Sequence, residues 1–179
     1  MQNVRKYLWD SEKQKFRPHI YLDGSPFPED FDEDAIYYNG GTAVAIQAGI
    51  LTRDEIAAVN AKLLENVEAA GAQSVGLTLY PCYPGEYFQN PIMASWHYQN
   101  GGDWTWFGAR MIQGLCANGF VQEAYDEIGP MLDRVLANNG FFEWYSISGE
   151  PRGSGTYRGS AGQLHVAIQA LRSWAESVR

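Results

Sequence analysis

The residues of this chain best suited to chemistry are a few carboxylates that lie among aromatic side chains. Glu143 stands between Phe142 and Trp144, so rings flank it on both sides. Such rings would partly exclude water from the carboxylate and would change its basicity. A carboxylate in this setting can act as a general base toward a water molecule or a hydroxyl group. Four other acids are weaker candidates for a partner carboxylate: Asp10, Asp32, Asp34 and Asp103.

Aromatic rings beside acids and an arginine suit a carbohydrate ligand. The apolar face of a pyranose stacks on a ring, and its hydroxyl groups pair with polar side chains. The residues that we expect to contact such a ligand are Trp9, Tyr38, Tyr83, Trp96, Tyr98, Asn100, Trp104, Trp106, Trp144, Arg152 and Tyr157. Core packing is an alternative role, above all for Trp104 and Trp106 at the start of a helical pattern. Asp103 also suits the N-cap of that helix.

Other chemistries find less support in the sequence. A sugar epimerase needs paired histidines as acid and base, but His19 and His97 fall in separate loops and His165 falls in the last helical segment. The acidic run at residues 29–34 lacks the ligand spacing of a calcium loop. There is also no CxxC, HExxH or glycine-rich phosphate motif. We therefore expect neither a metal nor a cofactor.

An internal repeat provides the framework for these residues. The segment 98–102 (YQNGG) matches the segment 37–41 (YYNGG) at four of five positions, and residues 157–162 form a weaker third copy. The copies recur about every 60 residues, a period typical of helical repeat proteins.

Helical patterns follow each copy of the repeat. Residues 41–50 carry no charge and residues 104–117 carry only Arg110, so both segments predict buried helices. Amphipathic patterns at 52–71 and 120–138 predict outer helices, and 159–177 predicts a last helix. The chain should therefore be one all-α domain, residues 1–179, in two helical layers with its long aromatic loops gathered at one end.

Local signals refine this outline. Thr52 and Glu55 form a capping box at the start of the first outer helix. Pro130 predicts a kink or a break near Asp126 in the second. Two apolar arms around the polar residues 11–15 predict a β-hairpin between residues 7 and 21. The proline-rich segment 75–98 predicts an ordered loop rather than a central strand.

Two longer motifs resemble a known family. NGGDWTWFGARM at 100–111 and GFFEWYSISGEPRGSGTYRGSAG at 140–162 are similar to the C-terminal part of the six-hairpin, (α/α)6-toroid glycosidases, near glycoside hydrolase family 63 and the neutral invertases. The resemblance covers roughly residues 4–175. It implies about half of a toroid, and an inverting hydrolysis in which two carboxylates act from opposite faces of the sugar. Glu143 matches the position of the base, with Arg152 and Tyr157 as hydroxyl contacts or loop braces.

The same resemblance leaves part of the machinery without a counterpart. The family's general acid lies on an earlier hairpin, and none of the acids in this chain sits in a matching motif. A non-catalytic, carbohydrate-binding remnant is therefore the main alternative to a hydrolase. Half a toroid would also expose an apolar edge, which predicts self-association into a dimer.

Composition limits the other partners. The formal net charge is −8, with 19% charged and 14% aromatic residues. This acidity argues against nucleic acid and anionic membranes as partners. No apolar run approaches the roughly 18 residues that a membrane span needs, and the first ten residues contain no apolar signal segment. Cys82 and Cys116 form no disulfide framework, so we expect reduced thiols and a cytoplasmic protein.

Overall fold

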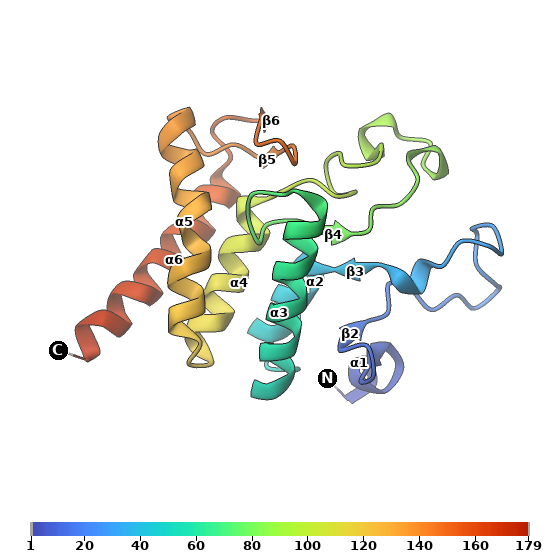
Figure 1. Cartoon of the computed structure of the whole chain (residues 1–179), viewed down its shortest axis with the longest axis horizontal. Helices are drawn as coiled ribbons and strands as arrows, with labels where there is room; N and C mark the ends of the chain where they lie inside the picture. The colour runs from blue at the N-terminus through green and yellow to red at the C-terminus, as the bar shows by residue number, and fades with distance from the viewer. Residues whose placement is uncertain (1, 179) are drawn as a thin grey trace.

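The computed structural model describes residues 2–178 and is mostly helical (Figure 1). Three antiparallel pairs of very short strands join the loops. No helix in this part of the chain is long and apolar enough to cross a membrane. The helices are α1 (Gln2–Leu8), α2 (Asn39–Gln47), α3 (Arg53–Ala70), α4 (Thr105–Ala117), α5 (Val121–Asn138) and α6 (Arg158–Ser177). The strand pairs are β1 (Trp9–Asp10) with β2 (Lys15–Phe16), β3 (Tyr37–Tyr38) with β4 (Leu79–Tyr80), and β5 (Trp144–Tyr145) with β6 (Pro151–Arg152). Single 3-10 turns are η1 (Glu33–Ala35), η2 (Gly85–Tyr87) and η3 (Pro91–Met93).

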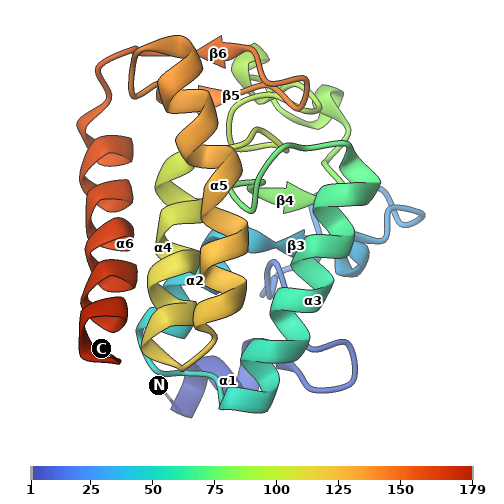
Figure 2. The ribbon, with the colours of Figure 1, turned by 60° about the vertical axis from the view of Figure 1, so that its left-hand side comes forward.

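The five long helices form two layers. Helix α4 lies at the centre of the first layer, with α2 on one side and α6 on the other, and α5 covers it. Helices α4 and α6 start at the end of the molecule that carries β5 and β6, and α3 and α5 run back toward that end (Figure 2). The main core lies between the layers, with Ile46, Ile112, Leu115, Met131 and Leu164 almost fully buried. The predicted alternation of buried and amphipathic helices is confirmed.

Glycines allow the helices of the first layer to approach closely. A Cβ on Gly40 would lie 2.7 Å from the ring of Phe107 on α4, and one on Gly114 would lie 2.7 Å from Ile46 on α2. These positions therefore require glycine for packing.

The capping prediction is confirmed, and of the kink or break predicted at Pro130 the break does not occur. Thr52 accepts a hydrogen bond from the backbone N–H of Glu55, whose carboxylate accepts one from the N–H of Thr52. Helix α5 instead runs unbroken through Pro130. Pro130 is exposed, while Ile128 and Met131 beside it are buried in the core. This packing holds the helix across the hydrogen bond that proline cannot donate.

The N-terminal hairpin is only partly as predicted. Just two residue pairs form, Trp9 with Phe16 and Asp10 with Lys15. The residues before them form helix α1, which Arg5 ties to α3 by two hydrogen bonds to the Glu55 carboxylate, at 2.9 and 2.7 Å. This long-range ion pair left no local signal in the sequence.

The repeated Asn-Gly-Gly motif does not mark equivalent positions. Helix α2 begins at Asn39, inside the motif, whereas α4 begins at Thr105, after it. The recurring feature is instead an aromatic residue at the N-cap of each first-layer helix: Tyr38, Trp104 and Tyr157. The prediction that Asp103 caps α4 is therefore wrong.

Candidate functional site

Glu143 lies at the loop end of the first helical layer, directly before β5. It is half-buried, and its carboxylate accepts hydrogen bonds from the Tyr98 hydroxyl at 3.3 Å and the Ser154 N–H at 3.4 Å. The backbone of Gly153, at a φ of 67°, passes so close to Glu143 that a Cβ on Gly153 would clash with the Glu143 carboxylate. Burial, and then the Glu143 charge, raise the pKa of Tyr98, which therefore remains a hydrogen-bond donor at neutral pH.

Aromatic side chains surround Tyr98 and fix the position of the ring whose hydroxyl group contacts Glu143. The Trp104 indole donates to the Tyr98 carbonyl at 2.9 Å and packs edge-on against the Tyr98 ring. Trp144 also contacts Tyr98, and Tyr157 contacts Trp104. Trp104 and Trp144 are only 3% and 7% exposed. These two indoles therefore brace the site, while Tyr98 and Tyr157 keep exposed surface for a ligand.

The other predicted contact residues are dispersed. Trp106 is half-buried on α4 beneath the Arg110 guanidinium, and Trp96 packs against Tyr80 at a φ of 66°. Trp9 packs against Phe16 beside the main core. Arg152 is exposed and pairs with Glu150 rather than Glu143.

The side chain of Asn100, which we predict to contact a ligand, is engaged by backbone groups in the structure. It is fully buried, and its amide binds the backbone of Tyr83 and Met93 through three hydrogen bonds. Its function is to hold the loop at residues 83–93 against the turn at residues 98–100.

The acid candidates are engaged elsewhere in the structure. Asp103 is fully buried, accepts hydrogen bonds from the backbone and hydroxyl of Ser74, and lies 2.8 Å from the Arg134 guanidinium. It is therefore unavailable as a proton donor to a ligand, which corrects the prediction. Asp10 caps the turn between β1 and β2, and Asp34 faces Lys13 at 3.5 Å. Within residues 2–178, no hydrogen bond joins the side chain of Asp10, Asp32, Asp34 or Asp103 to Glu143 or to its partners Tyr98 and Ser154.

Two carboxylates that the sequence did not single out stand out in the structure. Glu33, within the acidic run, is held by His19, Tyr21 and Tyr83. Glu127 on α5 is 8% exposed and accepts a hydrogen bond from Asn60 on α3 at 2.6 Å. Glu33 is one of five acids in the run at residues 29–34, and nothing local in the sequence distinguishes it from the others. Glu127 follows an ordinary amphipathic pattern, so only the packing of α3 on α5 reveals its burial.

Glu127 should make the stability of the protein depend on pH. Burial, and to a lesser extent Glu123 and Asp126, raise its pKa from 4.5 to about 7, although the Asn60 hydrogen bond opposes this. The folded carboxyl thus binds its proton more tightly than the unfolded one, so the contribution of Glu127 to stability is largest below pH 4.5 and is lost as pH rises to about 7. The loss is on the order of 2–3 kcal/mol.

Urea denaturation at pH 5 and pH 8 measures this effect. Glu127→Gln should remove most of the fall in unfolding free energy between the two pH values, while Glu123→Gln, at an exposed position of α5, should not. An equal pH dependence in the wild type and Glu127→Gln would contradict the assignment.

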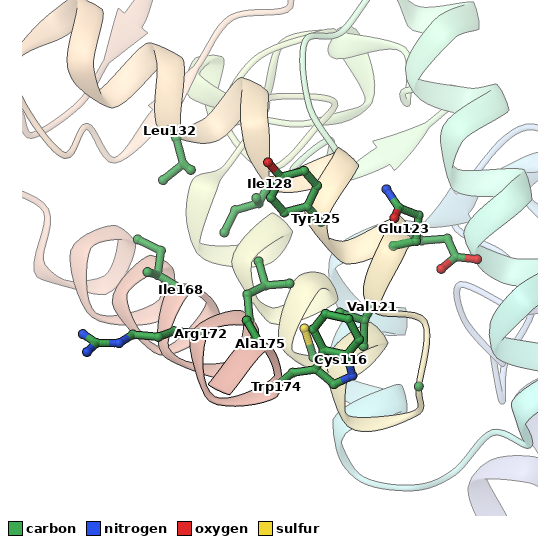
Figure 3. A pocket seen from close by; sticks show the side chains of 13 residues that line it. Cys116, Val121, Glu123, Tyr125, Ile128, Leu132, Ile168, Arg172, Trp174 and Ala175 are labelled. Atoms are coloured by element: carbon green, nitrogen blue, oxygen red, sulfur yellow. The ribbon is translucent and has the colours of Figure 1, made fainter. Parts of the chain in front are cut away.

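A large apolar groove opens between α5 and α6 (Figure 3). Its volume is about 720 Å³. Ile128 and Leu132 line the α5 wall, and Ile168 and Trp174 line the α6 wall. Tyr125 and Trp174, at its margin, are 68% and 47% exposed.

Comparisons with known proteins give no relative. No protein-family model matches the chain, and no curated protein matches it significantly. Within residues 2–178, no cluster of histidine, cysteine and acidic side chains could hold a metal ion. Cys82 and Cys116 are free thiols. The geometry around Glu143 and the sequence resemblance are therefore the basis of the candidate function.

Proposed function

We propose that this chain is a carbohydrate-active protein of the six-hairpin glycosidase type, with Glu143 as the general base of an inverting glycoside hydrolysis. The observation that carries the proposal is the setting of Glu143: a half-buried carboxylate at the loop end of a two-layered helical array, touched by a tyrosine hydroxyl and framed by aromatic rings. In this reaction the carboxylate takes a proton from the water that attacks the anomeric carbon, while a second carboxylic acid protonates the leaving oxygen.

A non-catalytic carbohydrate-binding protein is the second candidate. It is favoured by the positions of the acids, because Asp103 is locked under Arg134 and Asp34 faces Lys13. An inverting enzyme needs a second carboxyl group about 6.5–9.5 Å from the base. An epimerase has less support, since no hydrogen bond or ring contact within residues 2–178 joins His19, His97 and His165 to one another.

Hydrolysis of α-glucosides and sucrose separates the two candidates. The hydrolase should release a sugar whose anomeric configuration is inverted, which proton NMR during the first minutes of reaction detects. Binding of the same sugars without any turnover would instead establish the binding protein.

The proposed toroid also requires a partner for its open edge, and we assign a second copy of this chain to the groove between α5 and α6. The outer helices α3 and α5 follow α2 and α4, and the groove exposes apolar side chains of α5 and α6. Glu123 lies on the α5 wall and Arg172 on the α6 wall. Two copies that face each other with α5 against α6 would therefore place opposite charges together around an apolar centre.

Light scattering over a range of concentrations tests this partner. The wild type should have a mass about twice the 20.0 kDa of one chain, because the groove exposes apolar side chains that a second copy would cover. Trp174→Glu should give the monomer, whereas Leu22→Glu, at a 95% exposed apolar residue elsewhere, should leave the dimer intact. A wild type that is monomeric at every concentration would exclude the interface.

A further inference from the structure

A second carboxylate, Glu33, begins η1 (Glu33–Ala35), in the loop that precedes β3. The loops around β3 and β4 extend to one side of the helices (Figure 1). The Glu33 Oε1 atom accepts hydrogen bonds from the hydroxyl groups of Tyr83 at 2.5 Å and Tyr21 at 3.0 Å, and lies 2.8 Å from His19 Nδ1. The Tyr38 hydroxyl in turn donates to that of Tyr83 at 3.1 Å. Residues from two separate segments, 19–21 and 83, thus converge on one oxygen atom.

The protons of this cluster are directed toward Glu33. Burial, and then the Glu33 hydrogen bond, raise the pKa of Tyr83 far above its ordinary value and that of Tyr21 to about 12. Both tyrosines therefore stay protonated and donate to the carboxylate. With Nδ1 of His19 facing the same oxygen, the neutral imidazole carries its proton on Nδ1 and leaves Nε2 as an acceptor.

The side chain of His19 remains available to a ligand, because it is 49% exposed whereas that of Glu33 is 13% exposed. A ring nitrogen that does not face Glu33 can exchange a hydrogen bond with a ligand hydroxyl group.

A cavity of about 210 Å³ adjoins the cluster. It is smaller than the roughly 300–1,000 Å³ of sites for drug-sized molecules, so it suits one small ring. No lysine or arginine lines it, which favours a neutral ligand over an anionic one. Its lining combines polar and apolar residues: His19, Tyr38, Tyr83, Gln99 and Asn100 with Phe27, Leu79, Phe88 and Met93.

The turn at residues 98–100 connects this cavity to Glu143. The Tyr98 hydroxyl reaches Glu143, while the next residue, Gln99, lines the cavity. Asn100 then locks the turn by its three buried hydrogen bonds. The Glu33 cavity and the Glu143 site are therefore held against one rigid segment of backbone.

We propose that the cavity beside His19, Glu33 and Gln99 is a sugar subsite, which binds one neutral monosaccharide ring of an oligosaccharide whose neighbouring unit lies against Glu143. This proposal rests on the proposed carbohydrate function and adds to it a recognition site that the sequence did not identify. The His19 ring and the Gln99 amide exchange hydrogen bonds with the sugar hydroxyls, and the aromatic rings pack against the sugar ring. Glu33 holds His19 and Tyr83 in position from behind the lining.

Calorimetric titration with maltose and with sucrose tests the subsite. Gln99→Ala removes an exposed side chain and should fold normally; His19→Phe keeps a ring but removes the acceptor. Each variant should weaken binding about tenfold, the value of one lost hydrogen bond to a ligand. Gln89→Ala, which changes an exposed glutamine outside the cavity lining, is the matched control and should bind as the wild type does.

Turnover of Glu143→Gln separates this proposal from the proposed function. If Glu143→Gln abolishes hydrolysis while Gln99→Ala and His19→Phe bind the sugars as the wild type does, the subsite is wrong and the Glu143 site stands. If the cavity variants weaken binding while Glu143→Gln keeps full turnover, the subsite stands and the assignment of Glu143 is wrong. Failure of the wild type to bind either sugar would overturn both.

Discussion

Replacing Arg134 with methionine should lower the free energy of unfolding by about 3–5 kcal/mol, as expected when one partner of a buried ion pair is removed. The Arg134 guanidinium lies 2.8 Å from Asp103 Oδ1, donates to the Thr105 hydroxyl at 3.2 and 2.7 Å, and stacks over the Tyr145 ring at 4.1 Å. Asp103 and Tyr145 also exchange two backbone hydrogen bonds. One side chain of α5 therefore joins the start of α4 to β5, the strand that Glu143 precedes.

Urea denaturation followed by tryptophan fluorescence measures this effect. The loss is a large share of the roughly 5–15 kcal/mol that stabilises a typical domain. Lys62→Met is the matched control, because its ion pair with Glu65 lies at the surface of α3, away from the groove between α5 and α6, and should contribute less than about 1 kcal/mol. The double variant Asp103→Asn/Arg134→Met should lose less than the sum of the single losses, since it leaves no unpaired buried charge. A loss below about 1 kcal/mol for Arg134→Met would show that the ion pair does not stabilise the fold.

Glu143→Gln should reduce hydrolysis by about 10²–10⁴-fold, the usual contribution of a general base. The amide keeps the size of the side chain, and its one oxygen can still accept from Tyr98 or from Ser154, which donate to different oxygens of Glu143, but it cannot take a proton from water. The KM should change less than kcat, because the substitution removes an interaction that matters mainly in the transition state. Initial rates on the best α-glucoside substrate measure both constants.

The exposed Glu150 offers a matched control in the same loop. Glu150 pairs with Arg152 and makes no contact with Glu143 among the interactions described above, so Glu150→Gln should retain wild-type rates. Circular dichroism checks that both variants are folded. Undiminished turnover in Glu143→Gln would show that Glu143 is not the base. Another carboxylate, such as Glu33, would then be the candidate.

The sequence determined those features that depend on local patterns. Uncharged and amphipathic segments distinguished the buried helices from the covering ones, because a helix must bury its apolar face. The Thr52 and Glu55 pair fixed the start of α3, because the cap is made by residues close in sequence. The aromatic neighbours of Glu143 could also be identified from the sequence, since Phe142 and Trp144 are adjacent to it in the chain.

Only the tertiary structure decided the contacts between distant segments. The sequence pattern predicts that Asp103 is a helix cap, but in the structure Arg134, on another helix, and Ser74 enclose it. Glu33 was one acid in a run of five, and only residues from separate loops distinguish it from its neighbours. Helix α5 continues through Pro130 because burial of its flanking residues outweighs one lost hydrogen bond. Burial, ion pairing and cavity shape depend on which surfaces meet in space, and local sequence patterns do not specify those meetings.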